Sequence, residues 1–555
     1  MTFVTYYLVL FHDLCSMFRI ILPFSLLLAL TLKTSAQIVT PFDVLIEETD
    51  ITGMPGLQSY TFGTHEGKWV VFGGRIDGLH RRQPFASMDA AGRNEFIYVI
   101  DPTNQQVWTY ALSELPDNLR EQMSSTNMEF EQEGTTLYVA GGYGYSETSD
   151  EHITYPTLLA IDIPCMINAI TNDLTEMDCI RSIDNDLFAV TGGHLDKIGD
   201  VFHLIGGQKF TGRYNPMGPD FGPGFEQEYT SQARRFTIED DGQNLGITEL
   251  EHFTDEEYFH RRDYNVLAQI LPNGDEALTA FSGVFQIGAD IPYLHSTTVE
   301  ADGYTPNIDF AQYLNHYHCA TLPIYSAESS EMHNVFFGGI AQYTMDGNEL
   351  VQDNEVPFVK TIARVTRDAN GDLAEFKLPI EMPNWLGSGA EFIAIEGLPT
   401  YANGVIKFDE LEGDSILLGY IYGGIQSTAP NIFWDNEGDL SVASHLIYKV
   451  YINKENVTQV VNRNPQSESS LLMQVYPNPN DGNFNVRIML REVCDVTCTI
   501  FDTEGKELSK EVFKQLESGE VIISQWLENL HLGGTYIIRV TTPFETAQQR
   551  VIVKP

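Results

Sequence analysis

The chain has 555 residues, of which 43% are hydrophobic and 11% aromatic, so it can bury a large core and is not disordered as a whole. Its formal net charge of −45, from 77 Asp and Glu against 32 Lys and Arg, excludes nucleic acids and anionic membrane surfaces as general partners. At this length we expect more than one domain, unless a repeat extends a single architecture.

The first 36 residues have the pattern of a secretory signal peptide. From Met17 the sequence reads MFRIILPFSLLLALTLKTSAQ, with one early arginine, an apolar run and small residues before Gln37. We therefore expect residues 1–36 to be removed by cleavage after Ala36. Residues 1–16 fit poorly in front of such a signal, so Met17 is an alternative start. The apolar run is too short to span a membrane, and we expect no transmembrane segment after cleavage.

Residues 37–461 contain a sixfold repeat of β-strands. In each unit an apolar strand, such as KWVVF, runs into a pair of small residues, and another strand precedes it. Hairpins with Asp, Asn, Gly or Pro at the turn follow most pairs. Four strands per unit are typical of a β-propeller, and small residues allow positive φ and close backbone approach near its axis. The six pairs are Gly73 and Gly74, Gly141 and Gly142, Gly206 and Gly207, Ser282 and Gly283, Gly338 and Gly339, and Gly423 and Gly424.

This repeat resembles the Kelch family. The family signature is a glycine pair after an apolar strand, followed by tyrosine and tryptophan in the outer strands, as in IYVIDP and Trp108. The resemblance implies a six-bladed Kelch-like β-propeller, so the expected fold class is all-β. The chain departs from the family pattern at Ser282, which replaces a glycine, and most units lack the outer tryptophan. Five and seven blades therefore remain alternatives.

Residues 462–470 form a polar linker, and residues 471–555 read as a small β-sandwich, Ig-like, with strands of about six residues between turn dipeptides. The segment VYPNPNDGNF, the segments FDTEG and GGTYIIRV, and the terminal RVIVKP resemble the C-terminal sorting domain of type IX secretion cargo. The resemblance implies that the type IX machinery is a partner of this domain. It also implies that the protein is secreted or attached to the outer cell surface. An ordinary carbohydrate-binding or adhesion sandwich is the alternative.

Five cysteines remain after cleavage of the signal peptide. Export permits disulfides, and Cys165 with Cys179 is the natural candidate pair. Cys494 and Cys498 lie on one predicted strand, about 13 Å apart, which is too far to bridge. We expect Cys319 to be a buried small apolar residue.

The scarce basic residues are concentrated beside the glycine pairs and before the first strands of the units. His-Arg-Arg occurs twice, in LHRRQPF after the first pair and in YFHRRDYN before the first strand of the fourth unit. Adjacent strands of a blade are antiparallel, so the loop after the second strand lies on the same face as the start of the first strand. We therefore expect both segments at one mouth of the propeller. The candidate ligand-binding residues are Arg75, His80, Arg81, Arg82, Arg213, His260, Arg261, Arg262, His316 and His318.

The stretch NHYHC offers half of a metal site. Strand alternation would place His316 and His318 on one face, where they would suit Zn²⁺ or Cu²⁺. No carboxylate or third histidine can be placed beside them from the sequence. We expect no metal and no cofactor.

Two interpretations of the basic residues remain open. In one, the arginines brace loops by pairing with abundant Asp and Glu. In the other, they form a cationic mouth that binds an acidic glycan or an anionic protein. Further alternatives are an enzyme on acidic sugars, because Kelch-like propellers include sialic acid epimerases, and a scaffold without a small ligand. No catalytic residue can be nominated.

Overall fold

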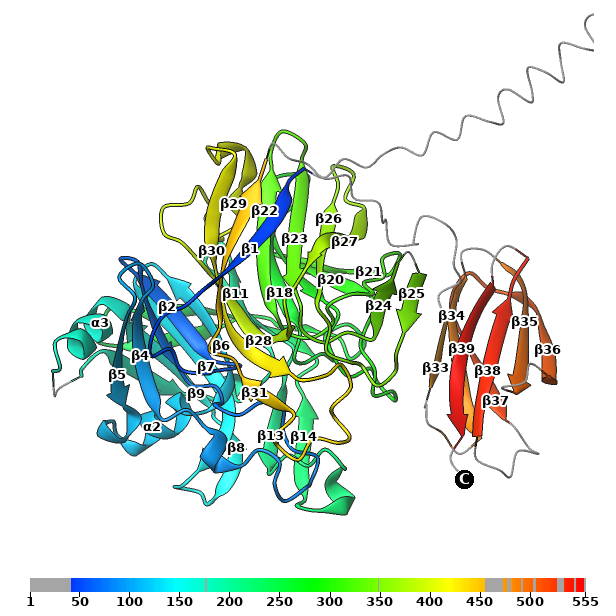
Figure 1. Ribbon diagram of the computed structural model, residues 1–555, viewed down its shortest axis with the longest axis horizontal. Coiled ribbons are helices and arrows are strands. Elements are labelled where there is room, and N and C mark those ends of the chain that lie inside the picture. Colours follow the sequence, from blue (N-terminus) through cyan, green and yellow to red (C-terminus); the bar gives the residue numbers. More distant parts are fainter. Residues whose placement is uncertain are drawn as a thin grey trace, which may run out of the picture.

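The structure is a computed structural model. Its described residues are 41–454, without 175, 176 and 348, and 473–553, without 477–479, 481, 491, 492, 503–505, 527–533, 544 and 545. The predicted signal peptide (1–36) and linker (462–470) lie outside these residues. Strands dominate the described chain (Figure 1), so the predicted all-β class is confirmed.

Helices are few and short in the part of the chain that the structure describes. None of them is long and apolar enough to cross a membrane. They are α2 (Asp117–Met123), α3 (Ile163–Thr171), and the 3-10 helices η1 (Ala90–Gly92), η2 (Leu112–Glu114), η3 (Asp186–Phe188), η4 (Pro219–Phe221) and η5 (Phe408–Glu410).

Six sheets built on four antiparallel strands follow one another along the chain, and together they are called the six-sheet body here. The first sheet contains β2 (Thr61–His65), β3 (Lys68–Phe72), β4 (Phe96–Asp101) and β5 (Gln106–Ala111). The second contains β6 (Thr126–Glu133), β7 (Thr136–Ser146), β9 (Thr157–Asp162) and β10 (Ile180–Asp184), with β8 (Glu151–Thr154) on β7. The third contains β11 (His194–Ile198), β12 (Val201–Ile205), β15 (Gln232–Asp240) and β16 (Leu245–Glu249), with β17 (Phe253–Thr254) on β15.

The remaining sheets of the body follow the same plan. The fourth contains β18 (Asn265–Ile270), β19 (Glu276–Phe281), β20 (Ser296–Glu300) and β21 (Gly303–Asn307). The fifth contains β22 (Ala320–Ser326), β23 (Glu331–Phe337), β26 (Thr361–Arg367) and β27 (Leu373–Glu381), with β29 (Ile406–Lys407) parallel to β22. The sixth contains β28 (Trp385–Ala394), β30 (Ser415–Ser427), β32 (Ile447–Asn453) and β1 (Asp43–Thr49), with β31 (Ser441–Ala443) on β30. Two further hairpins are β13 (Gln208–Gly212) with β14 (Phe225–Tyr229), and β24 (Tyr343–Asp346) with β25 (Glu349–Gln352).

The sixth sheet is assembled from both ends of the body. Strand β1 pairs antiparallel with β32, so that Asp43 lies opposite Asn453 and Thr49 lies opposite Ile447. This pairing was not predicted, because the strands of each unit were assigned from segments that are adjacent in the sequence. The N-terminal strand therefore completes the last sheet.

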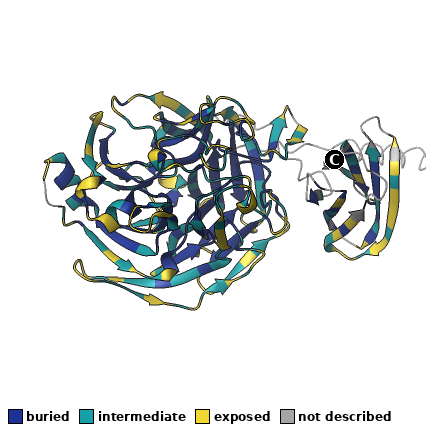
Figure 2. Cartoon of the chain, turned by 90° about the horizontal axis from the view of Figure 1, so that it is seen from below, coloured by how far each residue is buried: buried dark blue, intermediate teal, exposed yellow. Residues whose placement is uncertain are grey.

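The hydrophobic core is divided into clusters that lie between neighbouring sheets. Successive clusters join the first sheet to the second, the second to the third, and so on to the sixth, and one more joins the sixth to the first. Because both faces are covered, the second strand of a sheet can be apolar throughout, as in KWVVF. Figure 2 shows the buried residues in the interior of the body and the exposed ones mainly on peripheral strands and loops.

The six pairs of small residues link each sheet to the next. All twelve residues have φ between +53° and +101°, including Ser282, so the predicted need for positive φ is confirmed. The second residue of every pair donates a backbone hydrogen bond of 2.7–3.3 Å to the segment that leads into the first strand of the following sheet. The sixth bond runs from Gly424 to Leu57 in front of the first sheet, so these links form a cycle.

The C-terminal region has two sheets that share one core. The first contains β33 (Met473–Tyr476), β34 (Asn483–Leu490) and β37 (Gly519–Trp526), and the second contains β35 (Cys494–Asp502), β36 (Glu507–Leu516), β38 (Gly534–Thr541) and β39 (Thr546–Val553). A single hydrophobic cluster draws Val486 and Ile523 from the first sheet and Ile500 and Ile538 from the second. Two sheets around one core are the arrangement expected of a sandwich.

The cysteines behave as the sequence predicts. Cys165 in α3 forms a disulfide with Cys179, and their Cα atoms are 5.6 Å apart. Cys494 and Cys498 are buried and unbridged on β35. Cys319 is also free and buried, and burial raises the pKa of its thiol to about 12, so it is an inert packing residue.

Candidate functional site

A ring of six backbone hydrogen bonds surrounds the centre of the body on the face where the first strands begin. The N–H of each residue in the ring donates to the carbonyl of the corresponding residue in the preceding sheet, at 2.8–3.4 Å. The sequence of donors returns to its start, so the six residues lie around a common centre. We call these residues the axial ring: Ser59, Asn127, Gly192, Asp263, His318 and Gly389.

A cluster of polar and aromatic side chains lies beside the axial ring, and we call it the central cluster: His80, Tyr214, Tyr229, Arg262 and Tyr317. The ring centroids of His80 and Tyr214 are 4.9 Å apart. Arg262 donates from Nε to the Tyr229 hydroxyl at 3.0 Å and from Nη1 to Oδ2 of Asp263 at 2.9 Å. The guanidinium also lies over Phe285, 5.0 Å from the ring centroid. Loops of four sheets thus supply one cluster.

The central cluster brings the two His-Arg-Arg segments together. Burial, together with the positive charges of Arg262 and Arg75, lowers the pKa of His80 to about 4, so His80 lies within electrostatic range of both arginines. Burial likewise raises the pKa of Tyr317, and Arg262 acts in the opposite direction. His80 is therefore neutral at physiological pH, and Arg262 carries the positive charge of the cluster.

Several donors of the central cluster remain unused. Among the described residues, Nη2 of Arg262 and the hydroxyls of Tyr214 and Tyr317 have no hydrogen-bond partner, and none of these atoms is sealed in the protein interior. The three side chains are partly exposed. They therefore present one cationic and two neutral donors to solvent beside the axial ring.

Arg75 and Arg213 brace the loop formed by residues 76–92. Arg75 is 7% exposed, donates to Asp77 from Nε at 2.7 Å, and reaches the Asp89 carbonyl at 3.0 Å. Arg213 donates from Nε to the Ser87 carbonyl at 2.7 Å, and its Nη2 lies 3.7 Å from Asp89. The structure therefore places these two predicted residues in loop support.

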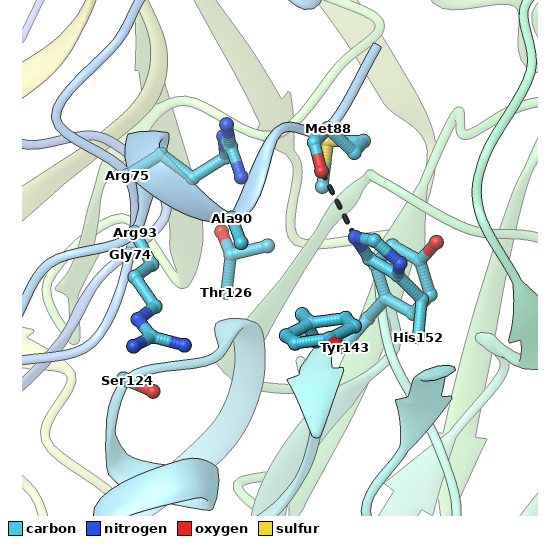
Figure 3. Close-up of a pocket in the computed structure, with 11 residues that line it drawn as sticks. Gly74, Arg75, Met88, Ala90, Arg93, Ser124, Thr126, Tyr143 and His152 are labelled. Atoms are coloured by element: carbon cyan, nitrogen blue, oxygen red, sulfur yellow. Dashed lines mark hydrogen bonds between the residues drawn. The ribbon is translucent and has the colours of Figure 1, made fainter. Parts of the chain in front are cut away.

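A small pocket lies next to Arg75, between the first and second sheets (Figure 3). Tyr143 and His152 line it, and Nε2 of His152 lies 3.0 Å from the Met88 carbonyl oxygen. Burial lowers the pKa of His152. The polar side chains that line the pocket thus already have contacts within the protein.

The three residues of the second His-Arg-Arg segment lie in three different environments. His260 stacks on Tyr229, with ring centroids 3.8 Å apart. Arg261 is fully buried and donates to the carbonyls of Tyr258, Ser282 and His295 and to the Thr297 hydroxyl. Arg262 belongs to the central cluster, and His260 contacts its edge through Tyr229. Arg261 therefore has a structural role, whereas Arg262, the next residue in the sequence, is partly exposed to solvent.

Arg81 and Arg82 lie on the exposed surface of the same face. Arg82 donates from Nη1 to the Trp434 carbonyl at 2.8 Å, which ties the loop of the first sheet to a loop of the sixth. Arg81 packs over Gly438 of that second loop. Both side chains remain exposed outside the central cluster.

The expectation that His316 and His318 share one strand face is wrong. They precede β22 in a segment that is not a strand, so the alternation of side chains along a strand does not apply to them. His316 is fully buried, with Nε2 3.0 Å from the Gln312 carbonyl, and its Nδ1 accepts a hydrogen bond from the Gln342 N–H. His318 instead lies 3.1 Å from Glu391. In the described chain, no three His, Cys, Asp or Glu side chains are grouped to hold a metal ion.

Buried or partly buried carboxyl groups that were not among the predicted site residues lie on strands β6 and β11, and Glu129 is two residues from Asn127 of the axial ring. Glu129 is 5% exposed and accepts a hydrogen bond from the Gly193 N–H at 2.9 Å. Burial raises the pKa of Glu129 to about 8, and burial raises the pKa of Asp196 to about 7. The alternation of polar and apolar residues in TNMEFEQE contains this signal, because Glu129 and Glu131 share one face of β6.

We expect Glu129→Gln to make the stability of the body less dependent on pH. A carboxyl whose pKa is raised on folding contributes its full stability below about pH 4.3, its unfolded pKa, and loses it as pH rises through the folded value of about 8. The amide keeps an acceptor for Gly193 and cannot ionise. Urea unfolding from pH 5 to pH 9 should show the variant gaining about 2–4 kcal/mol over the wild type toward pH 9.

Glu121→Gln is the matched control. Hydrogen bonds from Ser146 and Thr148 outweigh burial and lower the pKa of Glu121. Its contribution is lost only as pH falls below the usual carboxyl range, so its effect between pH 5 and pH 9 should be constant. Parallel stability curves for Glu129→Gln and the wild type would contradict the prediction.

Comparisons with known proteins identify the C-terminal region. Residues 474–554 match the family model described as "Secretion system C-terminal sorting domain". The predicted sorting domain is therefore confirmed, and the type IX secretion machinery handles the protein. Its predicted location is confirmed as well: the chain is exported to the cell surface or the extracellular space.

The solved structures that resemble the chain are distant from it in sequence. No curated protein matches the chain. The solved structure of YjhT is 10% identical, with a TM-score of 0.40, and the match covers 71% of this chain and all of YjhT. Dimeric latent PorU from Porphyromonas gingivalis is 9% identical, with a TM-score of 0.15, and the match covers 89% of this chain and 47% of PorU. Neither likeness is close enough to assign a fold or a function.

Proposed function

We propose that the body (37–461) is a six-bladed Kelch-like β-propeller and that its Arg/His-lined mouth binds an anionic ligand, most simply the carboxylate of an acidic glycan. The propeller is followed by an Ig-like sorting sandwich (471–555), which delivers it to the cell surface or beyond. Two features support the propeller: the cycle of links made by the small-residue pairs and the axial ring, each with one member per sheet. Six sheets around one axis are the arrangement of that fold.

The unused donors of the central cluster carry the binding proposal. Arg262 offers a guanidinium edge, and Tyr214 and Tyr317 offer hydroxyls from neighbouring loops. A guanidinium binds a carboxylate well, and hydroxyl groups suit the hydroxyls of a sugar. In a protein with a net charge of −45, such a local cationic group favours anions at this place only.

The competing roles fit the cluster less well. A pure scaffold would pair every arginine of the mouth with a carboxylate. Arg75, Arg213 and Arg262 have such partners, whereas the hydrogen-bond partner of exposed Arg82 is the Trp434 carbonyl.

An enzyme on acidic sugars would need a group that exchanges protons near neutral pH among the arginines. Burial lowers the pKa of His80 to about 4 and also lowers the pKa of His260, so neither histidine suits that task. Burial raises the pKa of Glu129 to about 8, and burial of His318 is outweighed by Glu391, which raises the pKa of His318, so these two groups keep the enzyme as the second interpretation. Glu129 is only 5% exposed and already accepts the Gly193 N–H, which favours the binding role.

A glycan array tests the binding role. The wild-type protein should bind to array positions that carry sialylated, uronate-containing or sulfated glycans, and it should not bind to neutral glycans. Arg262→Ala and Tyr317→Phe should weaken retention, the former by roughly 10- to 100-fold, the value of one charge-assisted hydrogen bond. Arg120→Ala is the matched control, since it removes the same charge from α2. Equal retention of acidic and neutral glycans, or no effect of Arg262→Ala, would reject the proposal.

A further inference from the structure

Three large apolar side chains are exposed on the loops around the central cluster. Phe85 is 73% exposed, Phe221 is 72% exposed and Trp434 is 49% exposed. They belong to what we call the rim loops, residues 76–92, 213–224 and 428–440, which come from the first, third and sixth sheets. Large exposed apolar residues that gather in one area of a soluble protein indicate a contact surface.

The rim loops are tied to one another, with residues 76–92 in the middle. On one side, Gly222 packs against Pro84, and Arg213 donates to the Ser87 carbonyl at 2.7 Å. On the other side, Arg82 donates to the Trp434 carbonyl, and the Asn436 side chain donates to the carbonyls of Leu79 and His80. In Figure 1 these loops gather beside the hairpin of β13 and β14. Their aromatic residues are therefore held on a braced surface.

The aromatic side chains are continuous with the central cluster. His80 belongs to the middle rim loop and Tyr214 to the loop of the third sheet, and these two residues touch. Phe433 packs edge-on against both His80 and Trp434, with centroid distances of 5.5 Å and 5.0 Å. A chain of ring contacts thus leads from Tyr214, which lies within electrostatic range of Arg262, through His80 and Phe433 to the exposed indole.

Charge and spacing indicate what this surface binds. Arg81 and Arg82 are exposed on the same loops as these aromatic rings, and Arg82 donates to the carbonyl of Trp434. Protein interfaces also use aromatic residues and arginine, but this surface continues from the central cluster, whose open donors suit a carboxylated sugar. Aromatic rings beside cationic donors suit an acidic oligosaccharide, whose sugar rings pack on aromatic faces and whose hydroxyls and carboxylates accept hydrogen bonds.

We propose that Phe85, Phe221 and Trp434, with Arg81 and Arg82, form an extended subsite for the sugars that continue from a carboxylated sugar held at the central cluster. This inference rests on the proposed binding function. It names an oligosaccharide, instead of a single acidic sugar or a protein, as the natural ligand.

Calorimetric titration with matched pairs of probes tests the subsite. The pairs are N-acetylneuraminic acid with 3′-sialyllactose, and glucuronic acid with an aldotetraouronic acid. In at least one pair, the oligosaccharide should bind the wild type about tenfold more tightly than its monosaccharide, which corresponds to 1.4 kcal/mol. The variant Phe85→Ala/Phe221→Ala/Trp434→Ala should lose this gain and keep its affinity for the monosaccharide.

The control variant is Phe96→Ala, which removes an exposed aromatic ring from β4 outside the rim loops and should keep the gain. Equal affinity of the wild type for mono- and oligosaccharide, or a gain that survives the triple substitution, would overturn the subsite and leave the central cluster standing. Absence of binding by all four acids would overturn both proposals. Thermal unfolding should be unchanged in the variants, because the substituted side chains are exposed.

Discussion

Replacement of Arg261 by methionine is expected to lower the free energy of unfolding of the body by about 3–5 kcal/mol. Arg261 is fully buried, and burial lowers the pKa of its guanidinium to about 10, so it is still charged at neutral pH. Methionine is apolar and shorter, and it leaves the buried carbonyls of Ser282 and His295 without donors. Urea unfolding at pH 7 measures the loss.

Arg262→Met is the matched comparison, because the same substitution is made one residue away. Its side chain is 11% exposed, but its carboxylate partner Asp263 is 26% exposed and can be hydrated once the guanidinium is gone, so the cost should be smaller, about 1 kcal/mol. Its effect should instead be on ligand binding. If the two variants lost equal stability, the assignment of a structural role to Arg261 and a surface role to Arg262 would be wrong.

Gly141→Ala is expected to destabilise the body by about 3–5 kcal/mol or to prevent its folding. Gly141 has φ of +67°, and a Cβ atom at this position would overlap the carbonyl oxygen of Val190 in the lead-in to the third sheet. The same carbonyl accepts the hydrogen bond of Gly142 that links the second and third sheets. The added methyl group must therefore push two sheets apart.

Gly134→Ala separates the two causes of this effect. Gly134 lies in the turn between β6 and β7 with φ of +60°, and a Cβ atom there would meet nothing within 4 Å. Only the backbone cost of about 1 kcal/mol should appear. Thermal and urea unfolding of both variants measure the difference. A Gly141→Ala protein as stable as Gly134→Ala would show that the sheets can move apart freely.

The repeated part of the fold could be predicted because its physical requirement is local. A strand that ends against the next sheet needs a small residue with positive φ, and that need recurs six times, even where Ser282 replaces glycine. The pairing of β1 with β32 could not be predicted in this way. Its register depends on residues at opposite ends of the body, and nothing in DVLIEET specifies a partner so distant in the chain.

The sequence could predict which loops meet at the candidate site, but it could not predict the directions of their side chains. Antiparallel pairing explains why both His-Arg-Arg segments reach one face, and the contact of His80 with Tyr214 lies there. Loops have no periodicity, however, so the sequence could not indicate that Arg261 turns inward while Arg262 turns outward. The same lack of periodicity explains the error at His316 and His318, which lie in a loop before β22 and not on the strand itself.

The sixth sheet contains strands from both ends of the body, and this has a consequence for truncated chains. Strand β32 ends at Asn453, and the first described strand of the sorting domain begins at Met473. A chain that ends before β32 lacks the strand that pairs with its N-terminal strand β1, and it also lacks the sorting domain. A chain that contains the sorting domain therefore also contains every strand of the sixth sheet, because β32 precedes that domain in the sequence.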